Sequence, residues 1–410
     1  MNPILRAIAL SGAMLAGCKP APPVETRTES PPPAAPAPEP PKPRPTAPVY
    51  MPESTPGEAG MSERLIPALD AAVRSAISNR ATPGAAIAVG RNGRVVVSRG
   101  YGRTDWAGGA PAVTDSTLYD LASLTKAVAT TTAAMMLEEQ GKLDIDQPVA
   151  RYLPSFDAPD KARITVRMLL THSSGLRSDH HLYREAKGRD EYLPRINARR
   201  LGYAPGTRTV YDDWNMVVLQ LAIERVTGEP LDRWLGEHVF GPLGMRDTRF
   251  NPPASLRPRV APTEVQAFRG GQLWGEVHDE NAWALGGVAG HAGLFSSARD
   301  LAVFARVMLN GGSHGDVRLV KPETVARWTR RQPGRGTRAL GWDTYGAGGR
   351  AFGHMGFTGT SIWMDPRTGV FVVLLTNRVN PTRANTRHNA LRRAVANAVL
   401  RSVVPGRTAR

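Results

Sequence analysis

The strand-like segments of this 410-residue chain lie near the two ends of a long globular region, and this placement limits what the chain can fold into. Residues 85–89 and 95–97 are apolar runs, and the Asn92-Gly93 pair between them is a strong signal for a tight hairpin. Three more β-rich runs, at 350–354, 360–364 and 370–375, are separated by turns. The two sets of strands must therefore meet in space if they form one sheet.

The middle of the chain is mostly helical in pattern. Apolar residues recur at helical spacing in the segments 61–77, 127–137, 216–226, 298–309 and 385–400. Ser297, with Asp300 three residues later, forms a helix-capping pattern at the start of the fourth segment. We therefore expect an α+β fold: a five-stranded antiparallel sheet flanked by helices, with an all-helical subdomain inserted at about residues 110–340.

The N-terminus reads as an export signal. Arg6 precedes a short apolar stretch, 7–16, which ends in Leu15-Ala16-Gly17-Cys18. This ending resembles a bacterial lipobox, which implies removal of a signal peptide, residues 1–17, and lipidation of Cys18. The alternative is an ordinary signal peptide followed by a chance or buried cysteine. Cys18 is the only cysteine, so no internal disulfide framework is expected.

Residues 18–58 are rich in Pro, Ala and Glu, and such a segment cannot bury a core. We expect a disordered, extended tether, followed by one globular domain at 59–410. Together with Cys18, the tether predicts a periplasmic lipoprotein of the bacterial cell envelope, attached to a membrane by its lipid. Lys19 after the cysteine favours the outer membrane by analogy.

The formal net charge of +16 raises the question of a nucleic-acid partner. The basic residues are nearly all arginines, scattered along the chain with higher density at 327–338 and 383–401. We interpret them as solvated surface and predict no nucleic-acid binding; attraction to an anionic envelope surface or an acidic substrate is the alternative. His180 and His181 lack further ligands at metal-site spacing, so no metal or other cofactor is predicted.

Ser123 and Lys126 stand three residues apart at the start of the apolar segment 127–137. On a helix this spacing places both side chains on one face, close enough to touch. A serine hydroxyl becomes a good nucleophile when a base removes its proton, and a desolvated lysine can be that base. The Ser-x-x-Lys pattern is typical of β-lactamases and penicillin-binding proteins, but four residues also match by chance, so the rest of the chain must supply partners.

Residues 61–402 as a whole resemble the serine β-lactamase superfamily, in particular class C-like penicillin-binding proteins and family VIII esterases. Three motifs carry the resemblance in the expected order: Ser123 to Lys126, then Tyr211-Asp212-Asp213 at the family's Tyr-x-Asn, then His354-Met355-Gly356 at its Lys-Thr-Gly or His-x-Gly. The resemblance implies the β-lactamase/transpeptidase-like fold, with the third motif on an edge strand facing the serine.

The resemblance also implies roles for these residues. Ser123 would form an acyl-enzyme, with Lys126 beside it as a base whose pKa is depressed by burial. Tyr211 would relay a proton or activate the deacylating water; whether Lys126 or Tyr211 is the base stays open. The backbone N–H groups of Ser123 and Phe357 would form the oxyanion hole. His354, Gly356 and Asp213 would line the substrate site.

Each motif also has a plainer interpretation. Tyr211 could pack at a domain junction, and His354 could be a strand histidine without a role. Asp213, which replaces the family's asparagine, could be a helix N-cap, or could contact Lys126 and keep it charged. His172 and His291 are interpreted as structural, and no Gly-x-Ser-x-Gly elbow supports a Ser-His-Asp triad.

The sequence therefore predicts an envelope serine hydrolase acting on an acyl substrate such as a peptidoglycan stem peptide, an ester or a β-lactam. A D,D-carboxypeptidase or endopeptidase is favoured. The alternatives are a carboxylesterase with weak β-lactamase activity and an inactive module that binds peptidoglycan peptides. Histidine at position 354 carries less positive charge than lysine near neutral pH, which argues against strong β-lactamase activity.

Overall fold

The computed structural model describes residues 51–346 and 349–404. The expected signal peptide, the lipidation site at Cys18 and the tether as far as residue 50 lie outside the described residues. Within the described part, no helix has both the length and the apolar character needed to cross a membrane.

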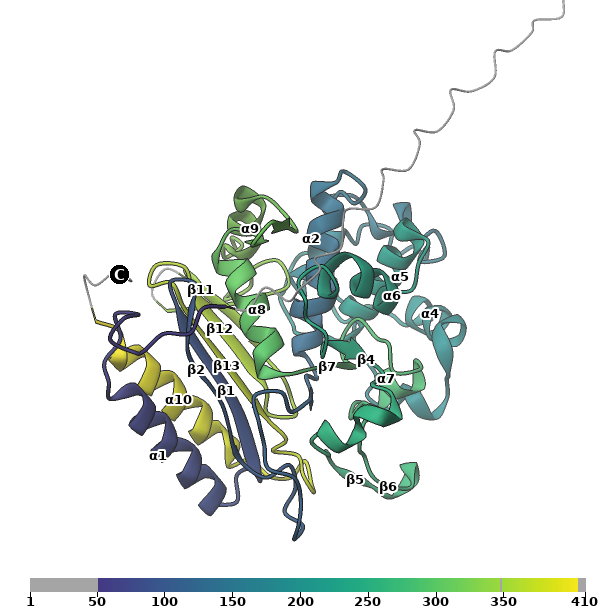
Figure 1. The fold of residues 1–410 in the computed structure, drawn as a ribbon. Helices are drawn as coiled ribbons and strands as arrows, with labels where there is room; N and C mark the ends of the chain where they lie inside the picture. The colour runs from purple at the N-terminus through teal and green to yellow at the C-terminus, as the bar shows by residue number, and fades with distance from the viewer. Residues whose placement is uncertain (1–50, 347–348, 405–410) are drawn as a thin grey trace, which may run out of the picture. The chain divides into compact units, whose positions relative to one another are not determined.

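A six-stranded antiparallel sheet, in the order β10-β11-β12-β13-β1-β2, organises the molecule (Figure 1). The N-terminal hairpin supplies β1 (Gly84–Arg91) and β2 (Arg94–Gly102), and the rest comes from the C-terminal part: β10 (Asp343–Tyr345), β11 (Ala351–Met355), β12 (Ser361–Asp365) and β13 (Val370–Thr376). β1 pairs with β13, which joins the two ends of the chain at the centre of the sheet. Asn92 and Gly93 both have positive φ, 51° and 78°, as the expected hairpin turn requires.

Helices cover both faces of this sheet. α1 (Leu65–Ser78) and α10 (His388–Ser402) lie side by side on one face, and α8 (Ala298–Leu309) lies on the other (Figure 1). Alternate residues of β1 divide accordingly: Ile87 packs with the α1 and α10 side chains, whereas Ala86 and Ala88 belong to the main core. Because both faces are covered, every residue of β1 and β13 is buried.

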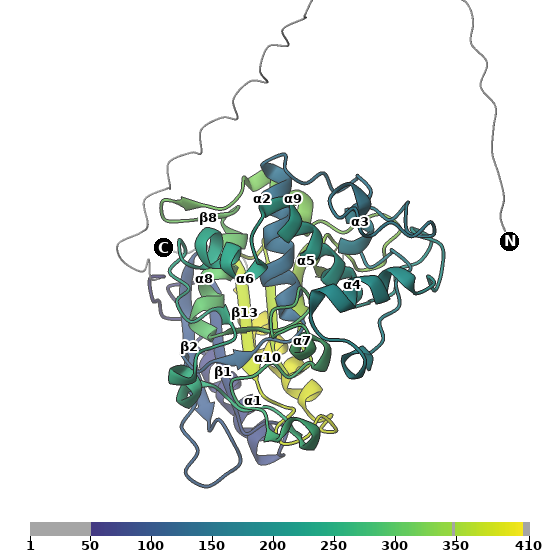
Figure 2. The same cartoon turned by 90° about the vertical axis from the view of Figure 1, so that its right-hand side faces the viewer.

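Most of the regular structure in the segment between the two halves of the sheet is helical (Figure 2). Its longest helices are a nearly continuous one, formed by the π-helical turn Lys126–Thr131 and α2 (Thr132–Glu139), and α5 (Trp214–Thr227), which ends at Gly228. Besides α8, the other α-helices of the described part of this segment are α3 (Val166–Leu170), α4 (Gly188–Ala198), α6 (Leu231–Leu235), α7 (Glu280–Ala284) and α9 (Pro322–Thr329).

The sequence pattern predicted an all-helical insertion, and this prediction is wrong. The insertion contains a small sheet, β3-β7-β4, formed by Tyr119–Asp120, Leu294–Ser296 and Arg249–Phe250, and two hairpins, β5-β6 (Val265–Gln266, Gly271–Gln272) and β8-β9 (Ser313–His314, Val317–Arg318). The edge strand β10 was also missed, so the main sheet has six strands rather than five. Strands of two or three residues are too short to show an alternating pattern.

The start of the globular domain differs from the expected residue 59. Met51 is buried in the core, and residues 52–54 pair with β2 through hydrogen bonds with Val95, at 2.9 and 3.0 Å. Residues 51–58 are therefore part of the folded body. The sequence did not predict this, because these residues are rich in proline and are held by backbone hydrogen bonds, which require no periodic pattern of apolar side chains.

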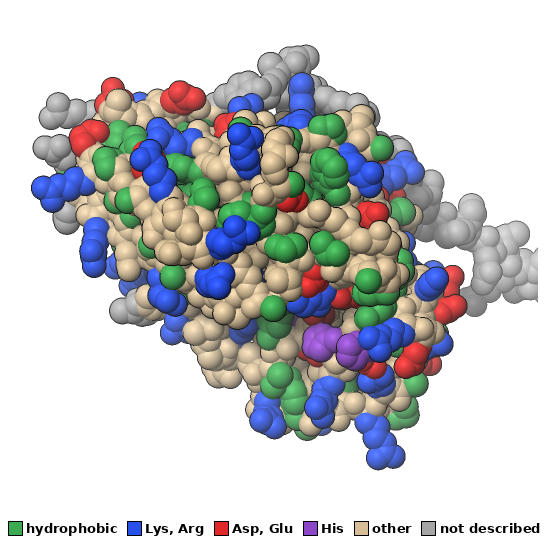
Figure 3. Space-filling model, turned by 90° about the horizontal axis from the view of Figure 1, so that it is seen from below, with side chains coloured by type: hydrophobic (Ala, Val, Ile, Leu, Met, Phe, Trp, Pro, Cys, Tyr) green, Lys and Arg blue, Asp and Glu red, His purple; other side chains and the backbone are tan. Residues whose placement is uncertain are grey.

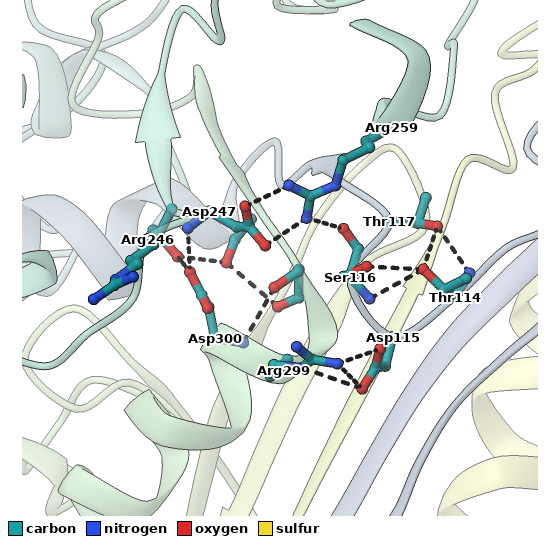
Figure 4. Close-up of polar contacts among 12 residues, drawn as sticks. Thr114, Asp115, Ser116, Thr117, Arg246, Asp247, Arg259, Arg299 and Asp300 are labelled. Carbon is teal, nitrogen blue, oxygen red and sulfur yellow. Dashed lines mark hydrogen bonds and ion pairs between the residues drawn. The ribbon is translucent and has the colours of Figure 1, made fainter. Parts of the chain in front are cut away.

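A polar network joins the segment before β3 to the start of α8 (Figure 4). Arg259 pairs with Asp247 and donates to the Ser116 carbonyl, and Arg299 pairs with Asp115. The Asp300 carboxylate accepts from the Asp247 backbone N–H, while the Asp300 N–H donates to Ser297 Oγ at 3.2 Å, which confirms the expected cap. Elsewhere the basic side chains are scattered, as the face in Figure 3 shows.

Candidate active site

Ser123 lies on a tight turn between β3 and the helix that starts at Lys126. Ala122, just before it, has a φ of 47°, a strained conformation for a residue with a Cβ. The Asp120 carboxylate holds this turn: it accepts from the N–H of Ala122 at 2.8 Å and from that of His278 at 2.6 Å. The turn therefore presents Ser123 in one defined orientation.

Lys126 reaches Ser123, as the helical spacing predicted. Its ammonium donates three hydrogen bonds: to Ser123 Oγ at 2.9 Å, to the His291 carbonyl at 2.9 Å and to Asp213 Oδ1 at 2.7 Å. The side chain is fully buried. Because an ammonium has three N–H donors, these bonds satisfy all of them.

The expectation that burial depresses the Lys126 pKa is wrong. Burial does oppose the charged form, but the Asp213 carboxylate, followed by Tyr211, outweighs it and raises the pKa of Lys126 above its ordinary value. The same contact lowers the pKa of Asp213, although burial acts in the opposite direction. The resting site therefore contains a lysinium–carboxylate pair.

Asp213 makes the contact with Lys126 that the sequence suggested, and its side chain does not cap α5. The start of α5 is capped instead by Asp212, whose carboxylate accepts a hydrogen bond from the Trp214 N–H at 2.9 Å. The neighbouring acidic residue thus leaves Asp213 free to face the lysine.

Tyr211 stands at the mouth of the site, just before α5, and is 40% exposed. Its ring centroid lies 5.0 Å from Lys126 Nζ and 4.6 Å from the His172 ring. Burial of the phenol raises the Tyr211 pKa, partly opposed by the Lys126 charge, so Tyr211 is protonated near neutral pH. His172 is buried against Tyr211, and the Nε2 of His291 contacts Asp279 at 2.9 Å.

His354 faces the same space from β11, with its ring centroid 6.1 Å from that of Tyr211. β11 is not the edge strand, since β10 pairs with residues 351–353; only His354 and Met355 lie beyond the end of β10. Burial, then the charges of Lys126 and Arg338, lower the pKa of His354 to about 3. His354 is therefore neutral at physiological pH.

The loop after β11 is bonded directly to the serine turn. Thr358 Oγ1 donates to the Asp120 carbonyl at 2.7 Å, and Thr360 Oγ1 donates to the Leu121 carbonyl at 2.9 Å. A Cβ at Gly356 would overlap the Leu121 carbonyl oxygen, so only glycine allows this approach. The loop that carries Phe357, the expected second oxyanion donor, is thus attached to the turn that precedes Ser123, and the Phe357 side chain is 49% exposed.

Arg338 also belongs to the site and was missed. Its guanidinium carbon lies 5.0 Å from the Tyr211 ring centroid. Burial is the main cause of the lowered pKa values of His172 and His354, and the charge of Arg338 lowers both further. Arg338 pairs with Asp343 of β10 at 3.1 Å. The sequence signal was the arginine-rich segment 327–338, interpreted as solvated surface, because a run of arginines does not show which guanidinium points inward. Among the described residues, no group of three or more His, Cys, Asp or Glu side chains could hold a metal ion.

Comparison with known proteins identifies the family to which the chain belongs. The family model described as Beta-lactamase matches residues 69–397. A Salmonella typhimurium protein provisionally named D-alanyl-D-alanine carboxypeptidase is 33% identical over 380 residues, covering 82% of this chain and 88% of the relative. A penicillin-binding protein homologue from Caulobacter crescentus superposes with a TM-score of 0.66 at 24% identity, covering 82% of this chain and 98% of that one. A family VIII carboxylesterase gives 0.63 at 23%, covering 83% and 99%.

The fold and the Ser123–Lys126–Tyr211 arrangement define a serine hydrolase built on the β-lactamase/transpeptidase-like fold. The family match spans most of the chain, and the chain belongs to the beta-lactamase family. The resemblance inferred from the three motifs is thereby confirmed at the level of the family and of the enzyme class.

Proposed function

We propose that this protein is a D,D-carboxypeptidase that removes the terminal residue from peptidoglycan stem peptides. The observation that carries this proposal is Arg338, a partly exposed guanidinium at the mouth of the site beside Tyr211. A carboxypeptidase must bind the free carboxylate of its substrate, and arginine binds carboxylates well through its planar set of donors. The neutral His354 cannot supply that charge. The name of the Salmonella relative supports the same activity.

The reaction would proceed through Ser123. Its Oγ bonds to the carbonyl carbon of the penultimate residue, the π electrons move onto the carbonyl oxygen, and the hydroxyl proton passes to Lys126 or Tyr211 in the fraction of the enzyme in which that group has first lost its own proton. Collapse of this intermediate breaks the C–N bond, and the proton leaves with the amine of the terminal residue. Water then repeats the addition on the acyl-enzyme, which releases the shortened peptide and returns the proton to Ser123.

The oxyanion of both steps would be held by the N–H groups of Ser123 and Phe357. The Thr358 and Thr360 bonds to the serine turn hold these two donors in one rigid unit. Such preorganised donors cost little reorganisation when charge develops in the transition state.

The neutral His354 favours one alternative, a carboxylesterase acting on uncharged acyl donors. An esterase would not need Arg338, so the two functions differ in their dependence on this residue.

We also propose that the enzyme acts in the cell envelope, anchored through a lipid on Cys18. The motif ending in Cys18 and the proline-rich segment after it support this location. Expression of a Cys18→Ser variant tests it: the protein should move from the membrane fraction to the soluble fraction, and an unchanged membrane fraction would exclude the lipid anchor.

The activity is tested with three substrates: an N-acylated peptide ending in D-alanyl-D-alanine, the same peptide with its C-terminus amidated, and a p-nitrophenyl ester. We expect release of D-alanine from the free peptide, abolished by Ser123→Ala. Arg338→Gln should raise KM for the free peptide about tenfold or more and leave the other two substrates unchanged. Arg330→Gln, which removes an exposed guanidinium from the same segment, is the matched control. Ser123-dependent ester hydrolysis without D-alanine release would instead establish the esterase.

A further inference from the structure

Arg392, on the C-terminal helix α10, reaches the loop that follows β11. Its Nη2 donates to the Gly356 carbonyl at 2.6 Å and to the Thr360 carbonyl at 2.9 Å. These two residues flank the short loop that carries Phe357, and Gly356 N–H itself donates to the Thr360 carbonyl at 2.8 Å. One guanidinium therefore closes the loop at both ends.

The Gly356 carbonyl and the Phe357 N–H belong to the same peptide group. A planar peptide turns as a unit, so a bond that fixes its carbonyl also fixes the direction of its N–H. A cationic donor on the carbonyl oxygen also polarises the group and makes its N–H a stronger donor. Arg392 thus acts on the atom opposite to the one proposed to hold the oxyanion.

The next peptide group is held in the same manner. Arg378 Nε donates to the Phe357 carbonyl at 2.7 Å, and its guanidinium carbon lies 4.4 Å from the centre of the Phe357 ring. The ring also stacks on His278, with centroids 5.8 Å apart. The peptide groups on both sides of the Phe357 Cα are therefore fixed by arginines.

The charge of Arg392 is not neutralised by an acidic partner within the described residues, where it forms no ion pair with a carboxylate. Burial, with a smaller contribution from Arg378, lowers the pKa of Arg392 to about 10, so it remains protonated near neutral pH. A partly buried cation without a carboxylate partner is costly unless its donors are satisfied. Its charge is instead directed at the loop carbonyls.

We propose that Arg392 is a positioning residue that orients and polarises the Gly356–Phe357 peptide group so that the Phe357 N–H stabilises the oxyanion. This inference rests on the proposed acyl-enzyme function of Ser123. Loss of a whole oxyanion donor lowers kcat by about 100-fold to 1,000-fold, so loss of its support should cost on the order of tenfold.

The test compares Arg392→Met, Arg392→Lys and the control Arg393→Met, which removes the adjacent, exposed guanidinium of the same helix. The substrate is a p-nitrophenyl ester, because every acyl donor uses the oxyanion hole, whereas only peptides test the carboxypeptidase proposal. The affinity for phenylboronic acid is measured as well, since its adduct with serine resembles the tetrahedral intermediate. All assays are run well below the Tm of each variant.

We expect Arg392→Met to lower kcat about tenfold with KM within about twofold, and to weaken boronate binding by the same factor. Arg392→Lys should recover part of both losses, and Arg393→Met should lose neither. An unchanged kcat in Arg392→Met, or a rate loss without weaker boronate binding, would overturn the inference. Ester hydrolysis without peptide hydrolysis in the unaltered protein would reject only the carboxypeptidase, and ester hydrolysis that survives Ser123→Ala would reject both.

Discussion

Replacing Asp213 by asparagine should make this enzyme faster at neutral pH. Asp213 forms a 2.7 Å ion pair with Lys126, which donates its other two hydrogen bonds to Ser123 and the His291 carbonyl. While Lys126 is an ammonium it cannot accept the serine proton. Asp213→Asn restores the Tyr-x-Asn motif and removes the charge that raises the pKa of Lys126, so burial then lowers that pKa.

The size of the effect follows from the contact distance. Two unit charges separated by 2.7 Å interact by about 1.5 kcal/mol in water and about 6 kcal/mol at an effective dielectric constant near 20. At 1.36 kcal/mol per unit, the Lys126 pKa should fall by about 1 to 4 units. The Asp213 side chain is 23% exposed, so we expect about 2 units. A pKa about 2 units lower increases the fraction of neutral Lys126 near pH 7.5, but a less basic lysine also accepts the serine proton less readily. Together these effects leave about a tenfold higher kcat/KM near pH 7.5.

The assay is the pH dependence of kcat/KM for a p-nitrophenyl ester, whose ascending limb reports the base of the free enzyme. We expect this limb at alkaline pH in the unaltered protein and at least one unit lower in Asp213→Asn. Asp213 also raises the pKa of Tyr211, so the limb moves in the same direction if the tyrosine is the base. An ascending limb at the same pH in both proteins would refute this reasoning. A rate of the unaltered enzyme that is already independent of pH from acidic pH upward, together with an inactive Asp213→Asn variant, would refute it as well and would identify Asp213 as the proton acceptor.

Three further predictions concern other parts of the structure. His354→Asn should lower kcat/KM for the ester without changing the shape of its pH profile between about pH 5 and 8, because the pKa of His354 is already about 3. An inflection near pH 6.5 that is present in the unaltered protein and absent from the variant would show that His354 titrates there. Gly356→Ala should reduce ester hydrolysis at least about 100-fold, since its Cβ overlaps the Leu121 carbonyl and displaces an oxyanion donor; near-normal kinetics would contradict the close approach. Burial raises the pKa of Asp300 to about 6, so ionisation of this carboxyl should lower the free energy of unfolding by up to about 3 kcal/mol as the pH rises from 4 to 7. Asp300→Asn cannot ionise and should lack this decrease. Urea unfolding at several pH values measures it, and equal pH dependence in both proteins would exclude it.

The sheet could be predicted largely from local signals. Asn92-Gly93 fixes the hairpin because both residues adopt positive φ, and the buried strands are continuous apolar runs because helices cover both faces. β10 could not be predicted, since three residues show no periodicity and pair only once β11 is in place. The same holds for residues 51–58, which are ordered by backbone bonds to β2.

The candidate site divides in a similar way. The three-residue spacing predicted the contact between Lys126 and Ser123, although Ser123 lies on the turn before the helix. Tyr211 and His354 were connected to them only through the resemblance to a family. The sign of the Lys126 pKa shift was predicted wrongly, because it depends on the distance to Asp213, which sequence does not give. Arg338 was missed because its position beside Tyr211 depends on how the segment before β10 folds back.

The two departures from the family motifs act on the charge of the site in the same direction. Aspartate in place of asparagine adds one negative charge, and neutral histidine in place of lysine removes one positive charge. Lys126 neutralises Asp213 at 2.7 Å, whereas Arg338 pairs with Asp343 of β10 and remains partly exposed. Under the function proposed above, the acyl transfer at Ser123 and the recognition of a carboxylate would therefore depend on separate ion pairs. Asp213→Asn should then change kcat/KM for an ester and for a D-alanyl peptide by the same factor, and Arg338→Gln should change their ratio.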